Sequence, residues 1–532
     1  MLKINTNTKF FLLLFIFSFI IVLIYFLNIE TATIYGDDLG FYFDHLKNKK
    51  FTDFFVYLHH SQKFRPVTAA INNILRMLFG KDLHGYFVFN VFIQTFISCV
   101  FALILNLFID SKFLSFFLSL LVGLSRFSYY NIIQLLNGGS LEGLALLVFL
   151  LMVYFLMRYF LNKARDARDN YKYLLYAIVF ANIGMYVHER YVVLLPAILL
   201  IALLHPVRYK LTIKKRMIIC LLAVFSLYIN YFLKVNVCHY AFFMGTSNQP
   251  MVFSMDRSVG FLQDAVLSII QLNSGEQGWA GLDYTKIHVI HQIIVMFIVE
   301  FLALVIILYA IRMNKAYKSG NKSDLSSLYI IVWLFLLGFL CLVPAVSTIR
   351  LEQRWLQAPF CTFILIILIA YTQIQTRYET AKSVLLVLFV CNMFVSDYNY
   401  LQGFKEKSYW TGAETTASMY RVAATMGVVK RPAKNLFILA EDKRFNKDAL
   451  LWDIGLGRIF DFYNAGNKNI IFLYADCVFN DSLQLPYVLS LNKETDQIIK
   501  LNGYEPSDYT DAFFKQRDNF LRARAGDTTT HD

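Results

Sequence analysis

Long uninterrupted apolar runs are the feature that most limits what this chain can become. The first run extends from Phe10 to Ile29, and ten more follow before residue 396. A helix of roughly 20 apolar residues crosses the hydrocarbon core of a bilayer, because a helix satisfies its own backbone polar groups there. The runs therefore predict an all-α polytopic membrane protein with about eleven spanning helices.

Composition agrees with a membrane protein. Hydrophobic residues make up 57% of the 532 residues and charged residues 16%, whereas soluble domains have about 45–50% and about 25%. The further runs are Tyr86–Ile109, Phe113–Tyr130, Leu141–Met157, Leu174–Val187, Tyr191–Leu204, Met217–Leu233, Val289–Ile311, Leu328–Val343, Pro359–Ile374 and Val384–Val395.

Basic residues occupy every second connector between the runs. These connectors are residues 158–172, 208–216, 312–322 and 377–382. Lys and Arg mark the cytoplasmic side of membrane proteins, so the net charge of +13 indicates topology and not a nucleic-acid partner. The predicted location is the bacterial inner membrane, with the N-terminus inside. The same rule divides residues 174–204 into a hairpin with His188-Glu189-Arg190 at an outer turn.

Two parts of the chain differ in composition. Residues 1–396 are predicted to form a transmembrane module with long outer loops at residues 30–85 and 234–288. Residues 397–532 are predicted to form a small α/β domain outside the cytoplasm. Its expected strands and helices are Asn435–Glu441, Asn469–Cys477, Thr415–Val429 and Asp448–Tyr463.

An acidic pair, Asp37 and Asp38, follows the first run at the start of an outer loop. Neighbouring side chains in extended backbone point in opposite directions. One carboxylate could therefore face a reaction centre while the other binds a metal or braces the loop. The alternative is a solvated turn, because Asp and Gly favour turns.

The loop around this pair resembles the first outer loop of the GT-C superfamily of membrane glycosyltransferases. The matching pieces are Asp37-Asp38, residues 53–60, Phe64-Arg65-Pro66 and the series Gly80, Tyr86 and Asn90. His188-Glu189-Arg190 followed by Pro196 resembles the Lys-Glu…Pro hairpin of the same superfamily, with His in place of the usual Lys. The resemblance covers residues 9–205. A narrower compositional likeness is to the phage-type serotype-conversion glucosyltransferases, which modify lipopolysaccharide or O-antigen.

The resemblance implies an enzyme and a reaction. An inverting glycosyltransferase would move a sugar from a polyprenyl-phosphate carrier to a surface glycan or lipid acceptor on the outer face. Asp37 matches the first acidic position and would be the base that takes the proton of the acceptor hydroxyl. No cofactor is certain, although a divalent metal such as Mg or Mn is a candidate beside Asp38.

Such a reaction needs cations for the carrier phosphate. The candidates are Arg65, Arg190, Arg350 and Arg354, with His188, Glu189 and Glu300 in supporting roles. The alternative is that these arginines pair with lipid headgroups or with Glu189 and Glu352.

A transporter, or a flippase or polymerase of glycan units, is the competing class, and a scaffold without catalysis is a third. A transporter would carry charges within its spans, and here only Glu142 and Glu300 qualify. Glu300 lies near the middle of the eighth run, where a charge costs roughly 2.5–3.5 kcal/mol. A buried polar contact between helices is the expected environment of its carboxylate.

Overall fold

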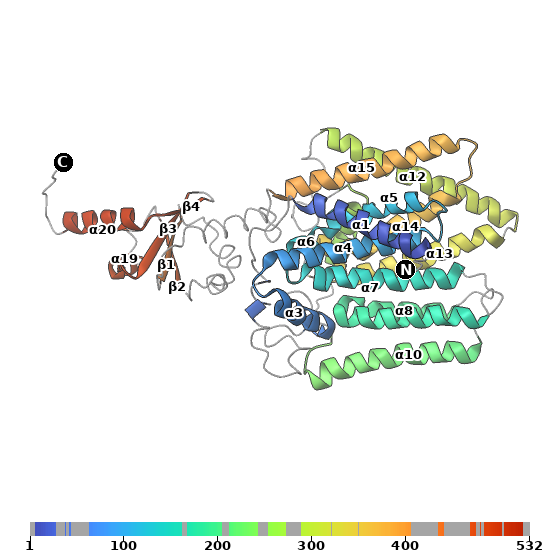
Figure 1. Ribbon diagram of the computed structural model, residues 1–532, viewed down its shortest axis with the longest axis horizontal. Helices are drawn as coiled ribbons and strands as arrows, with labels where there is room; N and C mark the ends of the chain where they lie inside the picture. Colours follow the sequence, from blue (N-terminus) through green and yellow to red (C-terminus); the bar gives the residue numbers. More distant parts are fainter. Residues whose placement is uncertain are drawn as a thin grey trace, which may run out of the picture. The chain divides into compact units, whose positions relative to one another are not determined.

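The computed structural model describes residues 6–27, 38, 42–43, 63–161, 167–204, 212–242, 254–272, 289–320, 322–348, 351–405, 435–440, 469–474, 479, 484–502 and 505–524. The chain divides into two compact units, one of residues 1–30 and 44–403 and one of residues 31–43 and 404–532. The first unit is helical and the second contains a sheet (Figure 1).

The described residues of the first unit form helices joined by turns. They are α1 (Thr6–Leu27), α3 (Pro66–Phe79), α4 (Leu83–Leu105), α5 (Lys112–Gly123), η2 (Arg126–Ser128), α6 (Tyr129–Ile133), η3 (Gly138–Gly143), α7 (Leu144–Leu161), α8 (Ala167–Val187), η4 (Glu189–Val193), α9 (Leu194–Leu203), α10 (Ile213–Tyr231), η5 (Phe232–Val237), α11 (Met255–Ile269), α12 (Val289–Lys318), α13 (Lys322–Val346), η8 (Gln353–Leu356), α14 (Gln357–Gln373) and α15 (Glu379–Lys405). Short 3₁₀ and π segments carry the η labels.

The predicted class, a polytopic membrane protein with a small C-terminal α/β part, is confirmed. Eight helical segments of the described chain are long and apolar enough to cross a membrane, or nine if α5 and the bent segment after it form one span. The sequence predicted about eleven. The two further runs do form helices, but α8 begins with charged residues and α9 has only ten residues, about 15 Å of helix.

Small residues let α7 and α8 pack closely. Ala177, Ala181 and Gly184 follow one another at helical spacing on α8, and all three are buried. A side chain at Gly184 would meet Val148 of α7 at 3.6 Å. Small interface residues permit this approach where lipid gives helices no hydrophobic reason to associate. Figure 1 shows α7, α8 and α10 running side by side.

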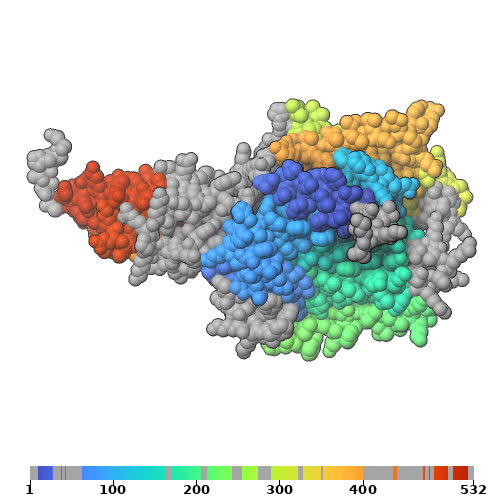
Figure 2. Space-filling view, in the orientation of Figure 1, coloured from blue at the N-terminus to red at the C-terminus, as the bar shows by residue number. Residues whose placement is uncertain are grey.

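Other helices keep an apolar surface for lipid. On α1, Leu13, Phe17 and Ile24 are more than half exposed, and α1 forms a dark blue patch on the surface of the helical unit in Figure 2. Such a surface would be unfavourable in water but suits the hydrocarbon core.

Charged groups sort the helix ends into two sets. Glu142, where the span of α7 begins, pairs with Arg190, which follows the end of α8. Arg354, just before α14, lies 3.7 Å from Glu142 (Nε to Oε1). The opposite ends of α7 and α14 lead into the basic connectors 158–172 and 377–382. The span of 24 residues from Gly138 to Leu161 measures about 36 Å as a helix, so the two sets lie on opposite sides of a bilayer.

A buried arginine fixes the bend after α5. Helix α5 and the following segment meet at 54°, and Arg126 at this point is only 1% exposed. Its guanidinium donates to the carbonyl of Ser268, after which α11 ends. Its Nε lies 3.9 Å from Oδ1 of Asp397 on α15. The buried charge therefore connects the bent segment to two helices that are distant in sequence.

The second unit contains a four-stranded sheet. Its elements are β1 (Asn435–Ala440), β2 (Asn469–Tyr474), α19 (Leu485–Ser490), β3 (Asp496–Asn502), β4 (Glu505–Asp508) and α20 (Thr510–Arg524). The strand order is β2-β1-β3-β4, with β1 parallel to both neighbours and β4 antiparallel to β3. The two predicted strands are confirmed, whereas the two predicted helices lie outside the described residues.

The sorting of charges predicts the orientation of the helical unit. We expect a reporter fused after Gly320, between α12 and α13, to show cytoplasmic activity, because this connector is basic. We expect a reporter fused after Lys430 to show periplasmic activity. Paired alkaline phosphatase and green fluorescent protein fusions measure both. Fluorescence of the Lys430 fusion would reverse the predicted sidedness.

Candidate functional site

The site begins where α3 meets the turn after α8. Pro66 occupies the first turn of α3, where its missing N–H costs nothing. The hydroxyl of Thr68 on α3 donates to the carbonyl of Val187 at 2.8 Å. This hydrogen bond gives a partner to a backbone carbonyl at the end of α8. This contact positions Arg65, which directly precedes Pro66. Its Nη2 donates to Oε1 of Glu189 at 2.6 Å, and its Nε to Oε2 of the same carboxylate.

A π-helix presents the next charged group. Segment η3 has the sequence Gly-Gly-Ser-Leu-Glu-Gly, and all six residues are buried. The N–H of Gly139 donates to Oδ1 of Asn90 at 3.1 Å. A side chain at Gly139 would come within 2.2 Å of that oxygen, so only glycine permits the approach. The packing of η3 on α4 therefore fixes Glu142.

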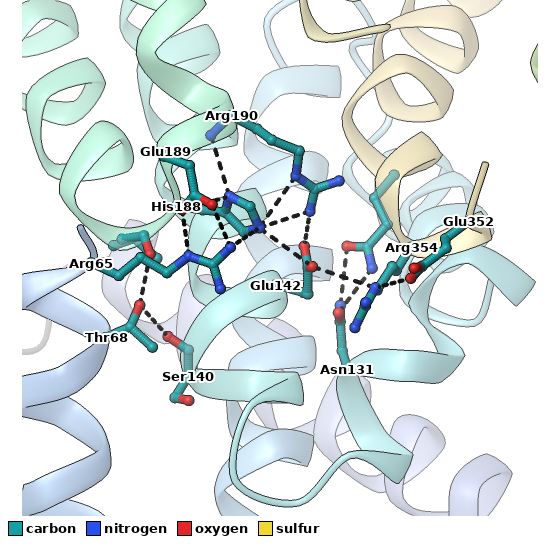
Figure 3. A network of polar contacts seen from close by, with 12 residues as sticks. Arg65, Thr68, Asn131, Ser140, Glu142, His188, Glu189, Arg190, Glu352 and Arg354 are labelled. Carbon is teal, nitrogen blue, oxygen red and sulfur yellow. Dashed lines mark hydrogen bonds and ion pairs between the residues drawn. The ribbon is translucent and has the colours of Figure 1, made fainter. Parts of the chain in front are cut away.

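Glu142 is the centre of a largely buried charge cluster (Figure 3). One carboxylate oxygen accepts from Nη2 of Arg190. The other lies 3.7 Å from Nε of Arg354 and 3.6 Å from Nε2 of His188. Three segments distant in sequence thus meet at one carboxylate. We call the set Arg65, Glu142, His188, Glu189, Arg190, Glu352 and Arg354 the charge cluster.

Arg354 is held by more than its ion pairs. Its guanidinium contacts the carboxylate of Glu352 and lies 4.0 Å from the ring centre of Tyr130, a favourable cation–π geometry. Nearby, Asn131 and Gln357 exchange two side-chain hydrogen bonds of 2.8 and 3.2 Å. These contacts connect α6 to the start of α14.

The titration of the turn residues follows from their surroundings. Burial, Arg190 and Arg65 lower the pKa of His188 to about 3, so the ring is neutral at pH 7. Burial acts to raise the pKa of Glu189, but the charge and hydrogen bonds of Arg65, together with other nearby groups, hold the pKa well below its usual value. His188 is therefore no cation at neutral pH, although it replaces the lysine of the resembled motif.

The structure brings together most residues that the sequence singled out. Arg65, Arg190, Arg354, His188 and Glu189 all belong to the charge cluster. The alternative to phosphate binding, in which arginines pair with Glu189 and Glu352, is what the structure shows for Arg65 and Arg354.

Other predicted residues lie elsewhere. Asp37 and Arg350 lie outside the described residues. Asp38 belongs to the second unit, and its side chain is fully buried. Glu300 is a correction: the expected buried polar contact is absent, because its side chain is exposed on α12 and pairs with no described residue.

Two charged residues of this region were not assigned to it from the sequence. Glu142 was considered only as a charge within a span, yet it is the hub of the cluster. The sequence did carry one signal: a carboxylate within an apolar run is unfavourable in the bilayer and therefore requires partners. Lys234 of η5 is 3% exposed and donates to the carbonyl of Phe242 at 2.8 Å. The spacing of residues in the sequence does not indicate the partners of Glu142 or Lys234.

Among the described residues, no group of three or more His, Cys, Asp or Glu side chains has the arrangement of a metal site. The carboxylates of the charge cluster are instead occupied by guanidinium groups.

Comparisons with known proteins add a distant likeness. The chain matches no known family model and no curated protein. Among solved structures it is similar to the Archaeoglobus fulgidus oligosaccharyltransferase in the apo form, and to the same organism's AglB in complex with an inhibitory peptide and a dolichol-phosphate. Each similarity has 10% identity and a TM-score of 0.44, and covers 92% or 93% of this chain and 69% of that chain. A likeness of this size does not decide the function.

We expect Glu142→Gln to destabilise the helical unit strongly. The substitution leaves the mostly buried guanidinium groups of Arg190 and Arg354 short of a carboxylate, and breaking a buried ion pair costs about 3–5 kcal/mol. Thermal unfolding in detergent measures the loss. Glu379→Gln is the matched control, because its carboxylate is 66% exposed and pairs with Lys382 at 3.5 Å, where an ion pair contributes about 0–1 kcal/mol. Equal losses would show that Glu142 is not central.

We also expect acid to destabilise the protein through His188. Its pKa is lower in the folded chain than in the unfolded chain, where it is about 6.5. The unfolded state therefore binds more protons, and stability falls as pH decreases from about 6.5 toward 3. His188→Gln, which keeps a hydrogen-bonding side chain, should flatten this part of the pH profile of unfolding. An unchanged profile would assign the titration to other groups.

Proposed function

We propose that this protein is an inverting glycosyltransferase of the GT-C type. It would transfer a sugar from a polyprenyl-phosphate carrier to a surface glycan or lipid acceptor on the outer face of the membrane. The observation that carries the proposal is the charge cluster, in which three arginines and three glutamates are gathered at the helix ends opposite the basic connectors.

The position of the cluster suits a lipid-borne phosphate. By the positive-inside rule, the helix ends that carry it face away from the cytoplasm. A carrier whose lipid tail lies in the bilayer would present its phosphate at this depth. Guanidinium groups bind phosphate oxygens in the bidentate geometry in which they bind carboxylates. Glu142 lies between two guanidinium groups, which is a geometry that also suits an anionic leaving group.

The proposed chemistry needs one base and several cations. Asp37 would take the proton of the acceptor hydroxyl, and the resulting oxygen would attack the anomeric carbon of the donor sugar. The bond from that carbon to the phosphate oxygen breaks on the opposite side, which inverts the centre. The polyprenyl phosphate leaves as an anion, and Arg190 and Arg354 would stabilise its charge.

Asp38 has a separate proposed role. Its carboxylate would brace the loop that carries Asp37 or hold a divalent cation such as Mg or Mn. The burial of Asp38 supports a bracing role, because a buried carboxylate requires partners. Addition of a chelator to the transfer assay separates these roles.

The transporter alternative depended on charges within the spans. In the structure Glu142 is engaged by Arg190 and Arg354, and Glu300 is exposed on α12. Neither observation favours a pathway for ions or solutes.

We expect Asp37→Asn to reduce transfer about 10²–10⁴-fold without loss of expression. Asparagine keeps the size of the side chain but cannot accept the proton. Membranes from a deletion strain that expresses each variant, supplied with polyprenyl-phosphate glucose and separately with other polyprenyl-phosphate hexoses, would report sugar incorporation into surface glycan. Asp110→Asn is the matched control, because Asp110 is exposed between α4 and α5.

Two outcomes would contradict the proposal. Retention of more than about a tenth of the activity by Asp37→Asn is too much for the loss of a general base. An unchanged surface-glycan composition in the deletion strain, for every sugar, would remove the assignment as a glycosyltransferase.

A further inference from the structure

Helix α12 carries an exposed stripe with a regular repeat. Successive residues of the stripe are separated alternately by four and by three positions. They are Val289, Ile293, Met296, Glu300, Ala303, Ile307, Ala310 and Asn314. All eight are exposed, and we call them the α12 stripe. This is the spacing with which one helix packs along another in a left-handed pair. Helix α12 lies at an edge of the helical unit, beside α15 (Figure 1).

The centre of the stripe is polar. Glu300 lies eleven residues into α12, about 17 Å along the axis, so its carboxyl group reaches the middle of the hydrocarbon core. A charged or unsatisfied carboxyl group there is unfavourable, and no described residue pairs with it. The described part of the chain thus leaves a hydrogen-bonding group exposed to lipid.

Small residues flank this group on the same stripe. Ala303 and Ala310 are seven residues apart and exposed. Small side chains at this spacing let two helix backbones approach, which is how helices associate where the hydrophobic effect is absent. The exposed residues around them, such as Leu304, Ile306 and Leu308, are large. The stripe is therefore shaped for another helix and not only for lipid.

We propose that the α12 stripe binds the α12 stripe of a second copy of this chain, in a parallel pair about a two-fold axis. In such an interface each residue meets its own counterpart. The two Glu300 side chains then lie at the same depth, and a protonated carboxyl group both donates and accepts a hydrogen bond.

Asn314 continues the stripe beyond the hydrocarbon core, at the basic end of α12. It lies fourteen residues after Glu300 on the stripe, which is two repeats of seven. In the parallel pair the two Asn314 amides also meet, and an amide both donates and accepts. The symmetric arrangement thus brings both polar residues of the stripe against their own counterparts at matching depths. This proposal is independent of the proposed glycosyltransferase activity.

Cysteine cross-linking of the full chain in native membranes tests the pair. Ala303→Cys should give a disulfide-linked dimer under mild oxidation, above the level of the parent protein with its native cysteines. Leu308→Cys is the matched control, because Leu308 is 38% exposed but lies about a quarter-turn or more from the stripe. If the Ala303→Cys protein is not expressed in the membrane, Ala310→Cys on the same stripe replaces it in the experiment.

A second substitution tests the role of the carboxyl group. Glu300→Leu in the Ala303→Cys background should lower the yield of dimer about tenfold, because polar contacts between membrane helices contribute roughly 1–2 kcal/mol. Equal cross-linking of Ala303→Cys and Leu308→Cys would overturn the proposal, as would a product in which Ala303→Cys is joined to a different protein. An undiminished dimer in Glu300→Leu would remove the carboxyl pair from the interface.

Discussion

The carboxylate of Glu142, buried between the guanidinium groups of Arg190 and Arg354, is the interaction on which the helical unit depends. A buried charge is tolerated only where partners replace water. Each partner comes from a different segment, so the requirement fixes the start of α7, the turn after α8 and the start of α14 relative to one another. Asn90 of α4 then holds the segment that carries Glu142. Its amide donates to the carbonyls of Ile132, Gln134 and Leu135 and accepts from the N–H of Gly139.

The same end of the unit holds further buried polar groups. Arg65 is fixed by Glu189, and Arg126 by the Ser268 carbonyl and Asp397. The opposite ends carry the basic connectors, which remain in water. This asymmetry gives the unit two chemically different sides: one is a solvated, positively charged surface and the other is a buried network of balanced charge.

Much of the candidate site could be inferred from sequence, for a physical reason. Arg65 lies in the long outer loop at residues 30–85, and Arg190 and Arg354 lie in short connectors between apolar runs. A bilayer allows each of these segments on one of only two sides. Alternating basic connectors therefore decide which charged residues share a side. The partners could not be inferred in the same way. Glu142 lies 48 residues before Arg190, and nothing in the spacing indicates that η3 turns this carboxylate toward η4. The exposure of Glu300 likewise depends on which face of α12 the neighbouring helices cover.

The sequence by itself determined the membrane class, the positions of most spans and the two strands that begin the C-terminal sheet. It could do so because apolar run length and charge alternation are local properties to which the bilayer responds directly. The tertiary structure decided which carboxylate each arginine binds, that His188 is neutral at pH 7, and which helix faces remain uncovered. These properties depend on burial and on distances between segments far apart in the chain, and both are set only when the helices pack.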